Sequence, residues 1–229
     1  MENIWSTPIY QLTTKTGKRV VVDVTSSVSA GLPPNKLLSE TLIKFFKKRG
    51  VESIVDFGAG ALRHTFPLLR AGFQVCAVEF EDQFKRTKCS EALRRAEKNG
   101  NFCKLIWPKD FKSDGRRFDA ALLCYVIQTM PLKEERELVL KVLTKKLRKD
   151  SYLLWMGRHG QTADIPNEQV VRDGYFMWPD REAHSFYTEF TTEVTHDWVG
   201  RHGFKRLRSL SERGTDQVFL YGKGSSIWA

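Results

Sequence analysis

The chain has 229 residues, 41% of them hydrophobic, which is enough for one well-buried domain, and no Pro-, Gly- or Ser-rich linker divides it. No apolar run reaches the length of a membrane span, and residues 1–5 lack the charged and apolar regions of a secretory leader, so a cytosolic protein without membrane association is expected. The 37 Lys and Arg exceed the 27 Asp and Glu, giving a net charge of +10. Such an excess attracts polyanions, although it is often only a solvated surface.

The four cysteines, Cys76, Cys89, Cys103 and Cys124, are widely spaced and form no Cys-x-x-Cys pair. Three of them fall in apolar strand patterns, where a thiol behaves as a small hydrophobe. The five histidines do not cluster with them. We therefore expect neither a disulfide nor a metal site.

Residues 1–35 are predicted to form an N-terminal extension with a β-hairpin, made by 8–13 and 19–24 around a Lys-Thr-Gly-Lys turn. The hairpin could cover a substrate or cofactor, or it could be a simple edge hairpin; nothing in it is chemically distinctive, which favours the edge hairpin. Apolar residues at helical spacing then predict a helix over 36–48 that packs one face on a sheet.

From residue 53 onward, strands and helices alternate in the pattern of a doubly wound, mostly parallel α/β sheet. A last helix and a terminal hairpin, which adds an antiparallel strand, complete the chain. The predicted strands are 53–57, 73–79, 102–106, 118–124, 152–156, 204–210 and 217–221, and the predicted helices are 61–71, 83–98, 132–148 and 192–202.

The turn Gly58-Ala59-Gly60 joins the first of these strands to its helix. Glycines allow a sharp turn and let the backbone approach a ligand closely. Glu79 ends the next strand, where its carboxylate can accept hydrogen bonds from a ribose diol. A dinucleotide fingerprint has a third glycine where Arg63 stands, so binding of NAD or FAD is disfavoured. The alternative is a plain turn whose glycines are only structural.

Together with Asp56, this turn resembles motif I of the class I S-adenosylmethionine-dependent methyltransferases, acid-x-Gly-x-Gly, and Glu79 resembles their ribose-binding acid. Leu62 stands where the family pattern usually has a glycine. The resemblance covers roughly residues 52–223 and implies a Rossmann-like, seven-stranded sheet that binds S-adenosylmethionine. Asp56, Gly58 and Gly60 would then hold the methionine end of the cofactor.

Asp110, after the third strand, resembles the family acid that contacts the adenine amino group, although it could be an ordinary loop acid. Candidates for the apolar surface against the adenine ring are Phe80, Phe111 and Trp107.

Ligands of open α/β sheets bind outside the carboxyl ends of the strands. Cys124, Tyr125 and Gln128 follow the fourth strand and should border the transferable methyl group, with Tyr125 a candidate catalytic residue. The Asn/Asp-Pro-Pro-aromatic motif of amino-methylating DNA enzymes and the Pro-Cys nucleophile of cytosine C5 methylation are both absent from this position.

The polar, aromatic stretch at about 157–190 is predicted to be a lid-like insertion in the methyltransferase domain, which spans 36–229. Arg158, Tyr175 and Trp178 are candidate substrate-binding residues. His159 is either a catalytic base or an ordinary structural or exposed histidine.

The sequence thus predicts an S-adenosylmethionine-dependent methyltransferase acting on an O or N atom of a small-molecule acceptor. A small acceptor is favoured because no nucleic-acid-binding motif is visible, whereas the positive charge favours RNA or DNA. The sequence is also compatible with a catalytically inactive methyltransferase-like binding module, and less so with a nucleotide-dependent oxidoreductase, which Arg63 disfavours.

Overall fold

The computed structural model describes residues 7–27, 32–158, 165–177, 184–211 and 216–224. Its seven-stranded sheet has the order β11-β12-β7-β6-β3-β4-β5, in which the neighbouring strands β7, β6, β3, β4 and β5 run parallel. The strands β12 and β7 are antiparallel, as are β11 and β12, so β12 alone runs against the rest. The bounds are β3 Ser53–Phe57, β4 Gln74–Glu79, β5 Phe102–Ile106, β6 Phe118–Cys124, β7 Leu147–Arg158, β11 Phe204–Ser211 and β12 Asp216–Lys223.

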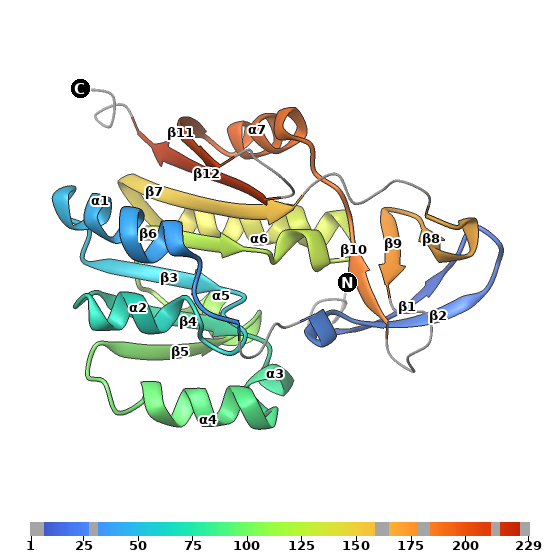
Figure 1. Cartoon of the computed structure of the whole chain (residues 1–229), viewed down its shortest axis with the longest axis horizontal. Helices are drawn as coiled ribbons and strands as arrows, with labels where there is room; N and C mark the ends of the chain where they lie inside the picture. The colour runs from blue at the N-terminus through green and yellow to red at the C-terminus, as the bar shows by residue number, and fades with distance from the viewer. Residues whose placement is uncertain (1–6, 28–31, 159–164, 178–183, 212–215, 225–229) are drawn as a thin grey trace.

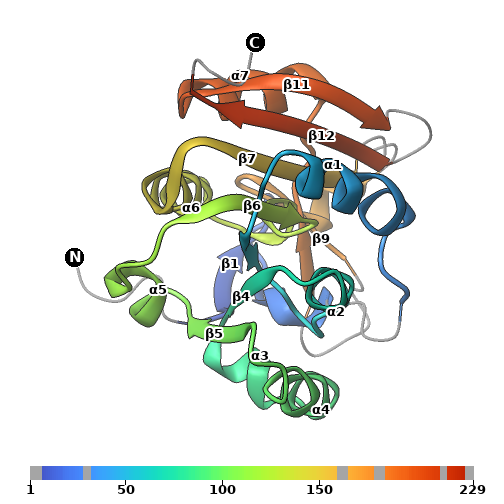
Figure 2. The ribbon, with the colours of Figure 1, turned by 90° about the vertical axis from the view of Figure 1, so that its left-hand side faces the viewer.

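Helices cover both faces of this sheet because its central strands are buried apolar runs on both sides (Figure 2). One hydrophobic cluster packs under the π-helical segment η2 and the helices α1, α2, α3 and α4, and the other packs under α5, α6 and α7. The bounds are η2 Leu38–Leu42, α1 Ile43–Lys48, α2 Thr65–Arg70, α3 Glu81–Lys85, α4 Thr87–Ala96, α5 Lys109–Ser113, α6 Lys133–Lys146 and α7 Thr192–Arg201. The predicted doubly wound architecture is confirmed.

Two further small sheets lie beyond the carboxyl ends of β3, β6 and β7 (Figure 1). One is the N-terminal hairpin, and the other comes from the predicted insertion. They join at His184, whose backbone N–H donates to Val21 and whose carbonyl accepts from the N–H of Asp23. The bounds are β1 Ile9–Thr13, β2 Arg19–Asp23, η1 Val24–Ser27, η4 Asn167–Gln169, β8 Val170–Val171, β9 Gly174–Met177 and β10 Ser185–Tyr187.

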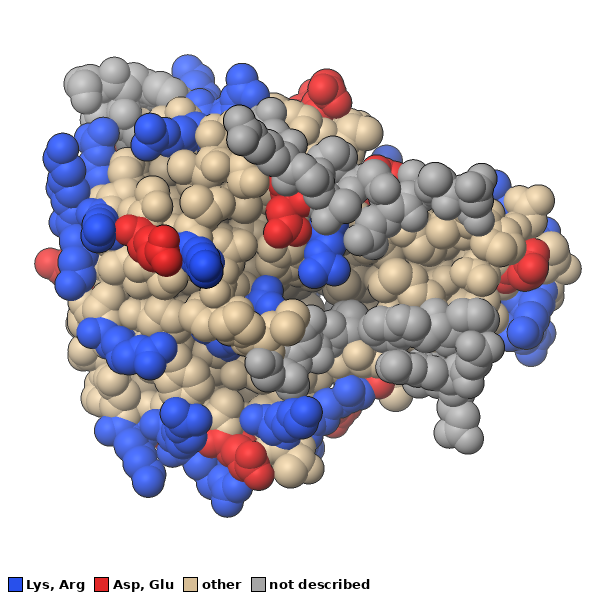
Figure 3. All heavy atoms as spheres, in the orientation of Figure 1, with Lys and Arg blue, Asp and Glu red and all other residues tan. Residues whose placement is uncertain are grey.

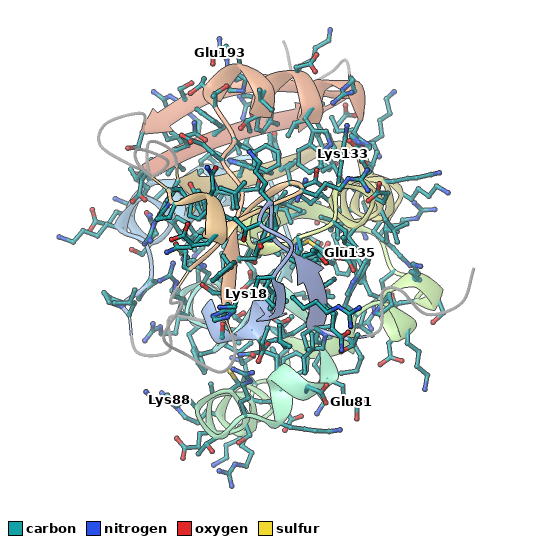
Figure 4. All side chains as sticks on the ribbon, turned by 90° about the vertical axis from the view of Figure 1, so that its right-hand side faces the viewer. Lys18, Glu81, Lys88, Lys133, Glu135 and Glu193 are labelled. Atoms are coloured by element: carbon teal, nitrogen blue, oxygen red, sulfur yellow. The ribbon has the colours of Figure 1, made fainter. Side chains whose placement is uncertain are left out.

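The hairpin is anchored to the main body by one buried and one partly exposed set of polar contacts. The Tyr10 hydroxyl donates to Glu135 of α6 at 2.6 Å, and Figure 4 shows Glu135 toward the middle of the molecule beside β1. The Arg86 guanidinium pairs with the Asp23 carboxylate and also donates to the Thr25 carbonyl at 3.1 Å. The prediction of a simple edge hairpin is therefore wrong, because these contacts place it over the carboxyl ends of the strands and not along the sheet edge.

Several predicted boundaries differ from the structure, including that of β7, which begins at Leu147 and not at residue 152. The helix expected over 61–71 begins only at Thr65, because Leu62 has a φ of +62° that no helix accepts. The helix expected over 83–98 is two helices, since Arg86 between them is extended. The fifth strand continues to Arg158, so Arg158 belongs to the sheet and not to the insertion.

On the face shown in Figure 3, Lys and Arg side chains gather along the left and lower margins of the main body, with acidic side chains between them. Within the described part of the chain, no helix is long and apolar enough to cross a membrane.

Candidate functional site

A cavity of about 250 Å³ lies where the carboxyl ends of β3, β4 and β6 meet the N-terminal hairpin and the insertion. Its wall therefore combines the glycine turn with Val24 and Thr25 of η1, which directly follows the hairpin, and with Met177 and Tyr187 of the insertion. The lining residues are Val24, Thr25, Phe57, Gly58, Ala59, Gly60, Ala61, Arg63, His64, Val78, Glu79, Phe80, Trp107, Cys124, Tyr125, Val126, Gln128, Thr129, Met130, Arg158, Met177 and Tyr187.

The turn after β3 can only be built with glycine at its first position. Gly58 has a φ of +70°, and a Cβ atom there would lie 2.3 Å from a Val126 methyl group. Any side chain at position 58 would clash with the loop after β6. The glycine thus allows the turn to pack closely against Val126, and the predicted approach of its backbone to a ligand stays a prediction.

Glu79 ends β4 beside this turn and is 8% exposed. Its carboxylate accepts from the N–H of Gly60 at 3.0 Å and from the N–H of Phe80 at 2.9 Å. Burial raises the pKa of Glu79 to about 7, although the two N–H donors act in the opposite direction. The loop and the acid thus form one unit, with carboxylate lone pairs left to accept from a ligand.

Asp56 does not line the cavity, although the sequence predicts it as a cofactor-binding residue. Its carboxylate is buried at 1% exposure and accepts from the Thr65 hydroxyl at 2.6 Å. Burial raises the pKa of Asp56 to about 6. The acid therefore connects the turn to the start of α2 and adds negative charge behind the cavity wall.

Tyr125 stands at the end of β6 with a φ of +61°, an uncommon conformation for a bulky residue. Its backbone N–H donates to the Met156 carbonyl at 2.8 Å. The guanidinium carbons of Arg63 and Arg158 each lie 5.4 Å from the centre of its ring. Two cations thus contact one aromatic ring at the cavity wall.

Gln128 lines the cavity, but its amide is held by protein groups. The amide oxygen accepts from the backbone N–H of Arg158 at 2.8 Å, and the amide nitrogen donates to the Arg158 carbonyl and, at 3.3 Å, to the Tyr187 hydroxyl. The Tyr187 hydroxyl also donates to the Arg158 carbonyl at 2.6 Å. These bonds fix Arg158 in place, so Gln128 positions the site and is not a free substrate ligand.

Besides Asp56, three further predicted ligand contacts lie away from the cavity. The Phe111 ring is fully buried, with its centre 5.8 Å from that of Phe57, and the Asp110 carboxylate accepts from the backbone N–H of Ile106 at 3.2 Å. Tyr175 packs on Tyr187 at 5.4 Å between ring centres. Phe80, Cys124 and Trp107 do line the cavity, whereas the predicted residues His159 and Trp178 lie outside the described residues.

His64 was not predicted as a site residue, yet it lines the cavity and is 5% exposed. Its Nε2 atom has no hydrogen-bond partner among the described residues. Burial, and secondarily the charge of Arg63, lowers the pKa of His64 to about 3, so the imidazole is neutral. His64 could have been predicted from its position close after the glycine turn. The helix expected over 61–71 obscures this signal, because it places His64 inside a helix.

No protein-family model and no curated protein matches the chain in sequence. Solved structures match it in fold. The chain is 13% identical to an S-adenosylmethionine-dependent methyltransferase from Clostridium acetobutylicum, with a TM-score of 0.62 over 87% of this chain and 96% of that one. It is 12% identical to the CcbJ methyltransferase of Streptomyces caelestis, with a TM-score of 0.63 over 89% and 96% of the two chains.

A third match is the 1,6-didemethyltoxoflavin-N1-methyltransferase of Burkholderia thailandensis, solved with 1,6-didemethyltoxoflavin and S-adenosylhomocysteine bound. It is 18% identical, with a TM-score of 0.60 over 83% of this chain and 80% of that one. Identities this low establish a likeness of fold. The chain therefore has the fold of the class I S-adenosylmethionine-dependent methyltransferases.

Proposed function

We propose that the chain is an S-adenosylmethionine-dependent methyltransferase acting on an O or N atom of a small molecule. The observation that carries this proposal is the unit of Glu79 and the turn of Gly58 and Gly60 at the wall of the cavity. A carboxylate at the end of the second strand of such a sheet suits a ribose diol, and the turn leaves space for a ligand against its backbone.

The charges of the residues around the turn suit this cofactor. Two carboxyl groups, Glu79 and Asp56, lie buried beside it, so a ligand that is cationic there is favoured over a polyphosphate. When bound, S-adenosylmethionine supplies an electrophilic methyl group on a positively charged sulfur. The diphosphate of NAD would instead face these acids, and Arg63 replaces the third glycine of its fingerprint.

We assign the ribose to Glu79 and the methionine end to the turn itself. Phe80 and Trp107 provide apolar surface for the adenine ring, in place of Phe111, which the core encloses. His64 offers a neutral imidazole on the same wall, whose Nε2 can donate or accept one hydrogen bond according to its tautomer.

The residues that cover the cavity support a small acceptor. Thr25 of η1, which follows the hairpin, and Met177 and Tyr187 from the insertion form its outer wall, as expected of a lid. These covering residues favour a compact acceptor over a nucleic acid. On this assignment, Tyr125 and Arg158 face the acceptor, and the roles of His159 and Trp178 remain predictions.

The chain's contribution to the reaction is to hold the acceptor atom in line with the transferred methyl group, which can supply much of the rate. A base is required only when the acceptor atom still carries its proton.

The test is the variant Glu79→Gln, with Glu81→Gln as its matched control, since Glu81 is an exposed acid two residues away. Losing charge-assisted hydrogen bonds of about 1.5 to 3 kcal/mol should weaken S-adenosylhomocysteine binding roughly 10- to 100-fold in calorimetric titration. The E81Q protein should bind like the wild type. Equal binding by E79Q and the wild type would refute the ribose assignment.

A further inference from the structure

The cavity has two ends of opposite charge. Near the glycine turn lie the carboxyl groups of Glu79 and Asp56, and around Tyr125 lie the guanidinium groups of Arg63 and Arg158. The proposed cofactor, S-adenosylmethionine, occupies the acidic end. The basic end faces the remaining space, and its two arginines both line the cavity.

Neither guanidinium group at the basic end is held in a tight ion pair, although the charge of Arg63 also acts on the buried Asp56 carboxyl and lowers its pKa against the larger effect of burial. Arg63 makes no hydrogen bond and no ion pair with any residue of the described part, and its guanidinium lies over the Tyr125 ring. The Nε atom of Arg158 lies 3.7 Å from Asp216, in a pair that is about half exposed, with side-chain exposures of 47% and 44%. Such an exposed ion pair contributes little free energy. The two terminal nitrogens of Arg158 make no hydrogen bond within the described part.

The basic end is also rigidly built. Gln128 and Tyr187 fix the backbone of Arg158 with three hydrogen bonds, and Gln128 is 2% exposed. Tyr125 is held in a left-handed backbone conformation that a bulky residue rarely adopts, and both arginine guanidinium groups contact its ring. Guanidinium groups bind carboxylate and phosphate in proteins, and both of these line one cavity around the same aromatic ring.

We propose that Arg63 and Arg158 form an anion site for the methyl acceptor, so that the acceptor is a small molecule bearing a carboxylate or phosphate group. This inference rests on the proposed function and adds the substrate class to it. The acidic end then takes the cationic cofactor, and the basic end takes the anionic acceptor beside it.

The test uses the wild-type protein saturated with S-adenosylhomocysteine, titrated with benzoate, phenyl phosphate or neutral benzyl alcohol and followed by ligand-observed NMR. The variants are Arg63→Gln and Arg158→Gln, with Arg94→Gln on the exposed side of α4 as the matched control. At least one of the two anions should bind with a millimolar dissociation constant or better, and benzyl alcohol should bind at least fivefold more weakly. The preferred anion shows whether the acceptor group is a carboxylate or a phosphate.

Each of R63Q and R158Q should weaken the preferred anion at least fivefold and leave S-adenosylhomocysteine affinity within threefold, whereas R94Q should change neither. Absence of anion binding to the wild type, equal binding of benzyl alcohol, or unchanged anion binding in R63Q or R158Q would overturn the proposal. A loss of S-adenosylhomocysteine affinity in R63Q without a loss of anion binding would overturn it too, since Arg63 would then serve the cofactor. If the wild type binds no S-adenosylhomocysteine, the proposed function itself fails, which is a separate result.

Discussion

Leu62 has a backbone conformation that is usually left to glycine. Its φ is +62°, and its side chain is fully buried in the core under α2. The related methyltransferase motif usually has glycine at this position, and the structure shows the physical reason: the turn requires a positive φ there. The buried leucine contacts offset the strain of about 1 to 2 kcal/mol.

This balance predicts an unusual order of stability for two variants. Leu62→Ala should lose about 2 to 5 kcal/mol of unfolding free energy, because it removes buried contacts while keeping the strain. Leu62→Gly loses the same contacts but relieves the strain, so it should be at least as stable as L62A. The measurement is equilibrium denaturation in urea.

The matched pair is Leu68→Ala and Leu68→Gly, because Leu68 is equally buried but lies in the helix α2. At this helical position, the unfolding free energy of L68G should be about 1 kcal/mol lower than that of L68A. If L62G is also less stable than L62A by this amount, Leu62 is not strained.

The raised pKa of Glu79 predicts how binding depends on pH. An ionised Glu79 accepts hydrogen bonds from ribose hydroxyls, and with a folded pKa of about 7 it ionises only above that pH. S-adenosylhomocysteine affinity should therefore fall as the pH drops from 8 to 6, by up to about tenfold per pH unit below 7. The stability of the ligand-free protein changes in the opposite direction: since the unfolded carboxyl titrates near 4.5, Glu79 lowers stability as pH rises from about 4.5 to 7.

Calorimetry across this pH range checks the prediction, with proton release on binding measured in two buffers of different ionisation enthalpy. In E79Q the remaining pH dependence should come only from groups such as Asp56, with its pKa of about 6. A steep dependence around pH 7 that persists in E79Q would contradict the assignment.

Site residues that lie in one local pattern were predictable from the sequence. Gly58 and Glu79 follow consecutive strands, and parallel strands bring their ends together. Phe111 was misplaced, because the choice of which aromatic side chain faces the cavity depends on the turn after β5. Gln128 was expected to contact substrate, but its partner Arg158 lies 30 residues away and cannot be read from spacing.

At the scale of elements, the N-terminal hairpin decides how the cavity is closed. The Asp23 carboxylate accepts from the Thr25 backbone at 2.9 Å and pairs with Arg86 of the main body. Thr25 in turn lines the cavity. The hairpin itself was predictable from its alternating pattern, but its docking was not, since Asp23 and Arg86 are 63 residues apart.

Asp23→Ala should therefore loosen the hairpin without unfolding the sheet. Amide hydrogen exchange in residues 9–27 should become faster, and S-adenosylhomocysteine should dissociate several-fold faster, because the cover over the cavity opens more often. Lys18→Ala, at the exposed tip of the hairpin, is the control and should behave like the wild type. Unchanged exchange in D23A would show that the Arg86 pair does not hold the hairpin.

At the scale of the whole molecule, a seven-stranded α/β body carries the glycine turn and Glu79, and two small sheets from distant parts of the chain close the space above them. The body was predictable because each strand and helix repeats one local pattern. The closing layer joins residues 9–27 to residues 165–177 and 184–187 through the backbone of His184, a contact that no periodicity reveals. The body and its cover together define a cavity with one acidic and one basic end.

The central claim is that this cavity binds S-adenosylmethionine, and the most direct measurement is calorimetric titration of the wild-type protein at pH 8. S-adenosylmethionine and S-adenosylhomocysteine should each bind one site per chain with micromolar dissociation constants, and NAD should not bind. Binding of NAD alone, or no binding of either S-adenosyl compound at high protein concentration, would contradict the account.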